Sequence, residues 1–384
     1  MKLLTGGKIV LNDRILERHS LLFTDRILSC VPENRVAGID AERFEANGAY
    51  VSPGFIDVHV HGAGGADTMD ADDKSMDTFS RCLAEHGVTA FLPTTVTSSR
   101  ERMNAAVENV RRAMERQLPG AKVLGLHLEG PWIDEGHKGA HPQEYIEDVP
   151  DAEWLARRSD AIRTVTFSPT KDPHYAFLKR LLELKIVPSI GHTDAGFEEG
   201  LAAIEAGARS ITHLFNAQNG LHHRMPGMVG AALCSSVTCE LITDGAHVRS
   251  ELFEPLCKSL GADRLMIVSD SMRVAGLPDG EYDFAGQRVS VKNGLPRLRD
   301  GTLAGSSMFM DRGVLNVWRA TGRPLPEVVG MAAGNPARLH GLEDRKGSIA
   351  PGHDADIVCF DDGLDVLMTF VEGRLVYECE SNEK

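Results

Sequence analysis

The chain has 384 residues, of which 42% are hydrophobic, a length and composition typical of a folded protein with a sizeable core. Its 41 Lys and Arg residues stand against 55 Asp and Glu residues, and the formal charge of -14 argues against binding to nucleic acid or anionic membranes. The start, MKLLTGGKIVLND, has no continuous apolar segment and no later apolar run is long enough to span a bilayer, so we expect a cytoplasmic protein.

The two ends of the chain have the same character. Residues 1–50 and 345–384 are rich in short strands and turns, and neither piece is long enough to bury a core of its own. We therefore expect both termini to combine into one small β-sandwich domain. The seven cysteines are scattered without a CxxC pair, so we read them as reduced thiols.

Between these ends, β-rich runs alternate with amphipathic stretches of helical length, the pattern of repeated βα units in an α/β protein. Eight such runs occur: FIDVHVH, TAFLPTTV, KVLGLHLE, IRTVTFS, IVPSIGH, SITHLF, CELITDG and LMIVSD. Eight strands close a barrel, so we predict a TIM-like (β/α)8 barrel over residues 51–344. The clearest helices are expected at 72–87, 99–117, 173–185, 195–207 and 250–261.

The first of these strands carries a pair of histidines. His59 and His61 are two residues apart, so their side chains project from the same face of the strand. Two imidazoles held side by side make half of a metal site. The pair alone also fits two solvated histidines beside neighbouring glycines. The residues at the other strand ends are needed to choose between these two interpretations.

Four further strands end in a side chain that can bind a metal: Glu129, His192, His213 and Asp270. In an eight-stranded barrel the carboxyl ends of the strands converge on one mouth. Each residue taken singly also fits a structural role, as a hydrogen-bonded histidine or an acid that caps a helix. The coincidence of all six at strand ends favours a centre for zinc, iron or a similar divalent ion.

Such a centre predicts a hydrolase. A bound divalent ion lowers the pKa of its water from 15.7 to about 7 and polarises a substrate carbonyl. Asp270 is the carboxylate at the end of the eighth strand, where it can accept the proton of that water and return it to a leaving nitrogen. We therefore assign Asp270 as the general base and then the general acid.

At these residues the sequence resembles the amidohydrolase superfamily, and within it the N-acetylglucosamine-6-phosphate deacetylases. The similarity covers essentially the whole chain. It is carried by the segments PGFIDVHVHG, HLEGPW, KGAHP, GHTDA, THLFNAQNGLHHRMPGMVG, DGAHV, VSDSMRVAGLPDGEY, GTLAGSSM, GNPARLHGL and GSIAPGHDADIV.

The resemblance implies hydrolysis of the acetamido group of N-acetyl-D-glucosamine 6-phosphate to D-glucosamine 6-phosphate and acetate. By motif match, Glu129, His192 and His213 look like the shared metal ligands and Asp270 like the catalytic carboxylate. Some relatives replace the first-strand pair and hold one metal. Because this chain keeps both histidines, the resemblance implies a second metal position with Glu129 as the bridge, and hence one or two ions per subunit.

For the sugar phosphate, the resemblance implies contacts from Ala140, His141, Asn216, Ala217, Arg224, His247, Leu303, Ala304 and Gly305. Arg224 suits a phosphate because its planar guanidinium donates two hydrogen bonds and stays charged. A homodimer is implied, with Arg224, and His247 as a second candidate, contributing across the interface. We read His137, His222 and His223 as lying outside the ligand set.

Two departures from the family and three alternatives stay open. Thr170 stands where many relatives carry an acid, and Ser271 lies in VSDSM where TDAM is commoner. The substrate could be N-acetylgalactosamine 6-phosphate, which differs in one hydroxyl. A cyclic-amide hydrolase would use a bridging lysine, for which Lys171 lies near the right strand end. A scaffold without chemistry should show gaps among the ligands, and none is missing.

Overall fold

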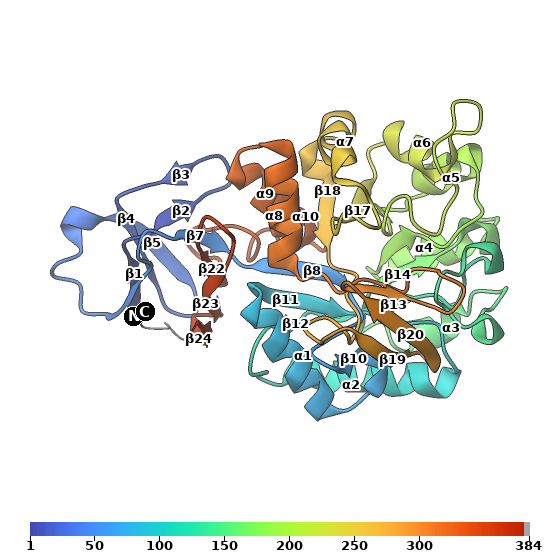
Figure 1. Cartoon of the computed structure of the whole chain (residues 1–384), viewed down its shortest axis with the longest axis horizontal. Helices are drawn as coiled ribbons and strands as arrows, with labels where there is room; N and C mark the ends of the chain where they lie inside the picture. Colours follow the sequence, from blue (N-terminus) through green and yellow to red (C-terminus); the bar gives the residue numbers. More distant parts are fainter. Residues whose placement is uncertain (380–384) are drawn as a thin grey trace.

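The computed structural model describes residues 1–379, which form a β-rich part and a larger α/β part (Figure 1). Figure 1 places the first and last strands of the chain together in the β-rich part, although they are more than 300 residues apart in sequence. Within the described residues, no helix is both long enough and apolar enough to cross a membrane.

The β-rich part consists of two sheets around a shared apolar core. One sheet has the order β5-β4-β1-β6 and the other the order β24-β23-β22-β7-β2-β3. The second sheet joins both ends of the chain, because β7 pairs antiparallel with β22. Phe370 meets the rings of Phe23 and Phe44 edge-on between the sheets. The strands are β1 Lys2–Thr5, β2 Lys8–Val10, β3 Ile15–Leu16, β4 His19–Phe23, β5 Ile27–Pro32, β6 Glu42–Glu45, β7 Tyr50–Pro53, β22 Ile357–Phe360, β23 Val366–Val371 and β24 Arg374–Glu378.

All eight predicted runs of the α/β part contain a strand, and these strands are parallel and largely buried. They form two curled sheets, β12-β11-β8 and β13-β14-β15-β16-β17-β18. The sheets meet at one seam through a parallel bridge between Thr94 and His127. At the other seam the amide of Asp270 donates to the carbonyl of His59 at 2.9 Å. The strands are β8 Phe55–Val60, β11 Val88–Pro93, β12 Lys122–Val123, β13 Leu126–Glu129, β14 Ile162–Phe167, β15 Val187–Ile190, β16 Ser210–Ile211, β17 Thr238–Ile242 and β18 Leu265–Val268.

The five helices expected from the sequence are present, each a few residues shorter than predicted. Local capping explains the firmest boundaries, since Asp72 accepts the amide of Ser75 and Ser99 accepts the amide of Arg102. The five are α1 Asp73–Glu85, α2 Arg100–Glu115, α4 Ala176–Glu183, α5 Phe197–Glu205 and α7 Phe253–Leu260.

Five other helices were not expected. Figure 1 shows α8, α9 and α10 between the parallel strands and the β-rich part. These helices are α3 Ala152–Ala156, α6 Gly227–Leu233, α8 Met310–Thr321, α9 Leu325–Ala332 and α10 Gly334–Leu339. Short 3-10 helices occupy Glu33–Arg35, Thr68–Asp70, Glu135–His137, Gln143–Tyr145, Pro169–Lys171, Ser250–Leu252 and Ala262–Arg264.

A three-stranded antiparallel sheet follows the last parallel strand. Its strands are joined by tight turns in the order β19-β20-β21. Phe284, at the end of β19, packs its ring edge-on against His61 at 5.6 Å between centroids. This sheet therefore reaches the strand ends that carry the predicted metal ligands. Its strands are Gly280–Phe284, Gln287–Lys292 and Leu295–Arg297, and a smaller hairpin pairs β9 Gly62–Ala63 with β10 Ala66–Asp67.

Lys346 forms a buried ion-pair cluster in the segment that returns to the β-rich part. Its ammonium lies 3.1 Å from Asp354 and 2.5 Å from Asp356, and all three side chains are at most 6% exposed. Removing one partner from a buried pair leaves an uncompensated charge, so we expect Lys346→Met to lower the free energy of unfolding at pH 7 by about 3 kcal/mol or more. Urea denaturation measures this change. Lys122→Met, which breaks a half-exposed pair with Glu372, should cost less than about 1 kcal/mol.

The same cluster should make stability depend on pH. Burial alone would raise the pKa of Asp354, but Lys346 and Arg345 hold it below its usual value. A depressed carboxyl pKa stabilises the fold above the unfolded value of about 3.9, and this contribution is lost as the pH falls through the lower folded value. The Lys346→Met protein should therefore lose less stability than wild type on acidification. An equal loss in both proteins would contradict this account.

Candidate metal centre and active site

The six side chains proposed from the sequence come together at the carboxyl ends of the parallel strands. His59 lies within β8 and His61 just beyond it, and Glu129 is the last residue of β13. The other three each lie two residues beyond a strand and share a left-handed backbone, with φ of 47° at His192, 30° at His213 and 47° at Asp270. Non-glycine residues seldom adopt this conformation, and such strain clusters at functional sites.

Glu129 stands at the centre of the cluster and is 2% exposed. Its Oε1 lies 3.1 Å from Nε2 of His192 and 3.2 Å from Nε2 of His213. Oε1 also lies 3.4 Å from Nε2 of His59, and Oε2 lies 3.4 Å from Nε2 of His61. One carboxylate thus faces imidazoles from both halves of the curled sheet.

Asp270 approaches the same centre from the last parallel strand. Its Oδ1 lies 3.4 Å from Nε2 of His59 and 3.2 Å from Nε2 of His61. Burial alone would raise the pKa of Asp270, but the two histidines outweigh this and hold the pKa below its usual value. The lowering comes from the positive charge that the two rings carry when protonated. As a carboxylate beside them, Asp270 can accept a proton from a group bound in the cluster.

The ring nitrogens of the histidines show which atoms are free to bind a metal. Nδ1 of His61 faces the carbonyl of Thr94 at 3.2 Å, and Nδ1 of His192 faces the carbonyl of His137 at 2.8 Å. A carbonyl only accepts, so each Nδ1 carries a proton, and in the neutral ring, the form that binds a metal, Nε2 is left bare. This leaves the Nε2 atoms of both rings turned toward Glu129.

The separations within the cluster fit a bound cation. Nε2 of His192 and Nε2 of His213 are 3.0 Å apart, and Nε2 of His59 is buried with no hydrogen-bond partner among the described residues. Two ligands at 2.0–2.1 Å from one tetrahedral ion lie about 3.3 Å apart, close to these spacings. Nitrogen and carboxylate donors of this kind suit zinc and related divalent ions.

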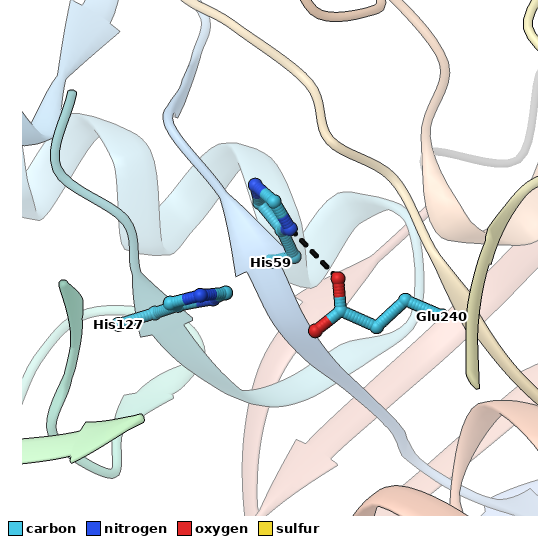
Figure 2. Close-up of side chains that lie close together, drawn as sticks. All are labelled: His59, His127 and Glu240. Atoms are coloured by element: carbon cyan, nitrogen blue, oxygen red, sulfur yellow. Dashed lines mark hydrogen bonds and ion pairs between the residues drawn. The ribbon is translucent and has the colours of Figure 1, made fainter. Parts of the chain in front are cut away.

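Three overlapping groups of the described residues have the spacing of a metal site. Two share Glu129, with His59 and His61 in one and His141 and His192 in the other. The third combines His59, His127 and Glu240 (Figure 2).

His141 is held differently from the other histidines. The amide of Thr97 donates to its Nδ1 at 3.1 Å, so the proton lies on Nε2, which donates to Oε2 of Glu129 at 3.1 Å. Burial lowers the pKa of His141 to about 4, and the ring is therefore neutral. The N–H of His141 therefore fixes the orientation of the Glu129 carboxylate.

A cavity of about 450 Å³ opens onto these residues. Most of the side chains expected to meet substrate line it, namely Ala140, His141, Asn216, Ala217, His247, Leu303 and Gly305. Ala304 does not line it and is fully buried in an apolar cluster. Arg224 does not line it either, and lies on an exposed loop beside His223.

Residues that the sequence reasoning missed also line the cavity: Glu135, Lys138, Phe284, Asp300 and Thr302. Lys138 belongs to the quoted KGAHP segment, so proximity to His141 was an available signal. Phe284 comes from the antiparallel sheet, for which the alternation of Val289 and Val291 with polar residues was an available signal. His137, expected outside the ligand set, lines the mouth and supplies the carbonyl that holds His192.

The two departures from the family pattern lie outside the cavity lining. The hydroxyl of Thr170 donates to Asp134 at 2.6 Å, and the hydroxyl of Ser271 donates to the carbonyl of Gly62 at 2.9 Å. Lys171 pairs with Asp148 at 2.5 Å and does not line the cavity. The position between the imidazoles, where a cyclic-amide hydrolase would need its lysine, is taken by Glu129.

Comparison with known proteins agrees with this geometry. The N-acetylglucosamine-6-phosphate deacetylase of Bacillus subtilis (strain 168) is 38% identical over 333 residues, which are 85% of this chain and 84% of that protein. The N-acetylgalactosamine-6-phosphate deacetylase of Escherichia coli O157:H7 is 34% identical over 97% of this chain and 98% of its own.

Among solved structures, a mutant of N-acetyl-D-glucosamine-6-phosphate deacetylase from Mycobacterium smegmatis, in complex with N-acetyl-D-glucosamine-6-phosphate, superposes with a TM-score of 0.90. It is 31% identical and covers 98% of this chain and 99% of its own. The model of the amidohydrolase family matches residues 50–376. The chain therefore belongs to the amidohydrolase family, whose members are metal-dependent hydrolases.

Proposed function

We propose that this protein is a metal-dependent deacetylase that hydrolyses the acetamido group of N-acetyl-D-glucosamine 6-phosphate, giving D-glucosamine 6-phosphate and acetate. The observation that carries the proposal is the buried carboxylate of Glu129, surrounded by imidazole nitrogens and open to a cavity of about 450 Å³. The relatives that span most of the chain support the substrate class.

We assign Glu129, His192 and His213 to one metal position and His59 and His61, with Glu129 as the bridge, to a second. A divalent ion held there supplies Lewis-acid polarisation of the amide carbonyl and a water of lowered pKa. Asp270 takes the proton of the attacking water and returns it to the leaving nitrogen, for which its carboxylate and its position beside both first-strand histidines are suited. His141, whose N–H donates to Glu129, would orient that carboxylate and contact the substrate from the cavity wall.

The sugar phosphate needs cationic partners in a protein of net charge -14. His247 lines the cavity of its own chain, so we assign it to its own site and not to a neighbouring one. Burial lowers the pKa of His247, but Asp244, 2.7 Å from Nδ1, raises it above its usual value, which favours the cation. Asn216, Ala217, Ala140, Leu303 and Gly305 would hold the sugar, with Ala304 backing that strip.

Arg224 is assigned to the phosphate of a neighbouring subunit in a homodimer. Its loop exposes two apolar side chains, Leu221 at 56% and Met225 at 71%. Arg224 does not line the cavity of its own chain. Exposed apolar residues beside cations are typical of a surface that is covered on assembly.

Arg224→Ala should lower kcat/KM by about 10–100-fold, the effect of losing a charged hydrogen bond of 1.5–3 kcal/mol. If the arginine serves the partner's site, mixing Arg224→Ala subunits with Asp270→Asn subunits should restore normal kcat/KM in about a quarter of the sites, because each mixed dimer contains one intact site. Acetate release at low substrate concentration measures this recovery. Arg180→Ala, at an exposed pair with Glu183, serves as the control and should change nothing. No recovery on mixing would contradict the assignment across the interface.

The architecture behind this proposal is a closed (β/α)8 barrel, supported by the contacts at both seams of the curled sheets. We take residues 51–344 as the barrel and residues 1–50 with 345–384 as a small β-sandwich domain; the last five of these lie outside the described residues. Because a sugar phosphate does not cross a bilayer unaided, we also keep the expectation that the enzyme works in the cytoplasm.

The galacto epimer is a second candidate substrate, favoured by the Escherichia coli relative that aligns over 97% of the chain. The test is to measure acetate release by the metal-loaded protein from both sugar phosphates and from the two sugars without phosphate. We expect turnover of the gluco phosphate, and at least 10-fold less without the phosphate because its charged contacts are lost, about 1.5–3 kcal/mol each. A preference for the galacto phosphate would make that sugar the assigned substrate. If the protein turns over neither sugar phosphate, the proposed deacetylase function is wrong.

A further inference from the structure

Glu240 is a buried carboxylate to which the proposed hydrolysis gives no role. It lies on β17, is 1% exposed, and has His59 and His127 as neighbours in the interior of the sheet (Figure 2). A carboxylate at this depth is costly unless it is hydrogen-bonded or paired. Its partners therefore indicate what it does.

One oxygen of Glu240 makes two contacts. Oε2 accepts the backbone amide of His213 at 3.2 Å and lies 2.9 Å from Nδ1 of His59, the contact dashed in Figure 2. Because Oε2 already accepts the amide proton, it meets the imidazole as an acceptor, and the ring carries its proton on Nδ1. In the neutral ring, the form that binds a metal, this leaves Nε2 of His59 without a proton.

That bare nitrogen points at the metal centre. Nε2 of His59 is buried, has no hydrogen-bond partner among the described residues, and lies 3.4 Å from Glu129 Oε1 and 3.4 Å from Asp270 Oδ1. Nε2 of His59 thus faces two carboxylate oxygens without a hydrogen bond to either. A cation between the three atoms would bind all of them.

We propose that Glu240 is the positioning residue of the second metal position. It fixes the Nδ1–H tautomer and the orientation of His59, and its charge makes Nε2 a stronger ligand, as carboxylates behind ligating histidines do. Through the amide of His213, the same oxygen also ties this position to the turn that carries a ligand of the first. The inference rests on the proposed function, and it makes Glu240 a residue that determines whether the second ion binds.

The grouping of His59, His127 and Glu240 is not itself a metal site, because both nitrogens of His127 are engaged. Nδ1 donates to the carbonyl of Val58 at 2.9 Å, and Nε2 therefore accepts from the hydroxyl of Thr166 at 2.7 Å. The ring of His127 packs edge-on against the ring of His59, with 4.6 Å between the ring centroids.

The test compares metal-free wild type with Glu240→Gln, Glu240→Leu and the control Thr166→Val, which alters the same buried network away from His59. Each protein is titrated with Zn²⁺, and the bound ions are counted. The tautomer of His59 is measured by ¹⁵N NMR of labelled histidines, with the His59 signal assigned by comparison with His59→Asn. We expect two ions in wild type and Thr166→Val and one in Glu240→Leu. Glu240→Gln, which keeps an acceptor but no charge, should bind the second ion about 10–100-fold more weakly.

Second-ion affinity that is unchanged in Glu240→Leu, or His59 that keeps its Nδ1 proton there, would overturn the proposal. If Glu240→Leu does not fold, as judged by its metal-free unfolding, an unchanged second-ion affinity in Glu240→Gln overturns it instead. Wild type that binds one ion would also overturn it, and would leave the deacetylase function standing, since Glu129, His192 and His213 can hold the first ion alone.

Discussion

Replacing Asp270 by Asn should reduce kcat by at least about 1000-fold, within the range that a general acid–base contributes. The amide has nearly the same shape and keeps an oxygen beside His59 and His61, but it cannot take up the proton of the attacking water. The bound metal should stay in place, because Glu129, His192 and His213 are untouched. Steady-state acetate release together with metal analysis of the purified variant measures both effects.

Asp194→Asn is the matched control for this substitution. Asp194 lies two residues from His192 but contacts the ring of His137 outside the ligand cluster, so its loss should change kcat by no more than a few fold. If Asp270→Asn keeps near-normal turnover, or if it loses its metal together with its activity, the assignment as the proton-transferring group is wrong.

Replacing Glu129 by Gln should remove both metal binding and activity. Both carboxylate oxygens face imidazole nitrogens, and the charge of Glu129 is what draws a cation into the cluster. Metal ions contribute several kcal/mol of charge stabilisation in hydrolysis. A loss of about 4 kcal/mol corresponds to a fall of about 1000-fold in kcat/KM, since each 1.36 kcal/mol is tenfold.

A control variant separates the loss of metal and activity in Glu129→Gln from misfolding. Glu135→Gln changes a carboxylate at the mouth of the same cavity that is outside the ligand cluster, and it should keep its metal. Circular dichroism should show both variants folded. A Glu129→Gln protein that binds metal with wild-type stoichiometry would remove this residue from its central place.

The eight parallel strands and the six clustered side chains could be predicted because both follow from strong local patterns. The short β-rich runs end just before residues that can bind a metal, such as His192 and Asp270, whose left-handed backbone also ends the strand. The exact ends of the strands could not be predicted, because they depend on hydrogen bonds between neighbouring strands.

Other features were missed. Helix α8 buries Met310, Val314 and Val317 at helical spacing, so a periodic signal was available there. Helices α8 to α10 lie between two parts of the molecule, and α10 coincides with the GNPARL part of a family motif. Glu240 looks like an ordinary strand residue until the fold brings it beside His59. Arg224 fits the family motif but lies outside the cavity of its own chain, which the sequence could not reveal for a single subunit.

The most direct test of the central claim is a metal titration followed by acetate release. Protein freed of metal is given increasing equivalents of zinc, iron or manganese in the presence of N-acetyl-D-glucosamine 6-phosphate. We predict no turnover without metal, a rise in step with the bound ion, and saturation at one or two equivalents per chain. Turnover by metal-free protein, or no acetate release from fully loaded protein, would contradict the account.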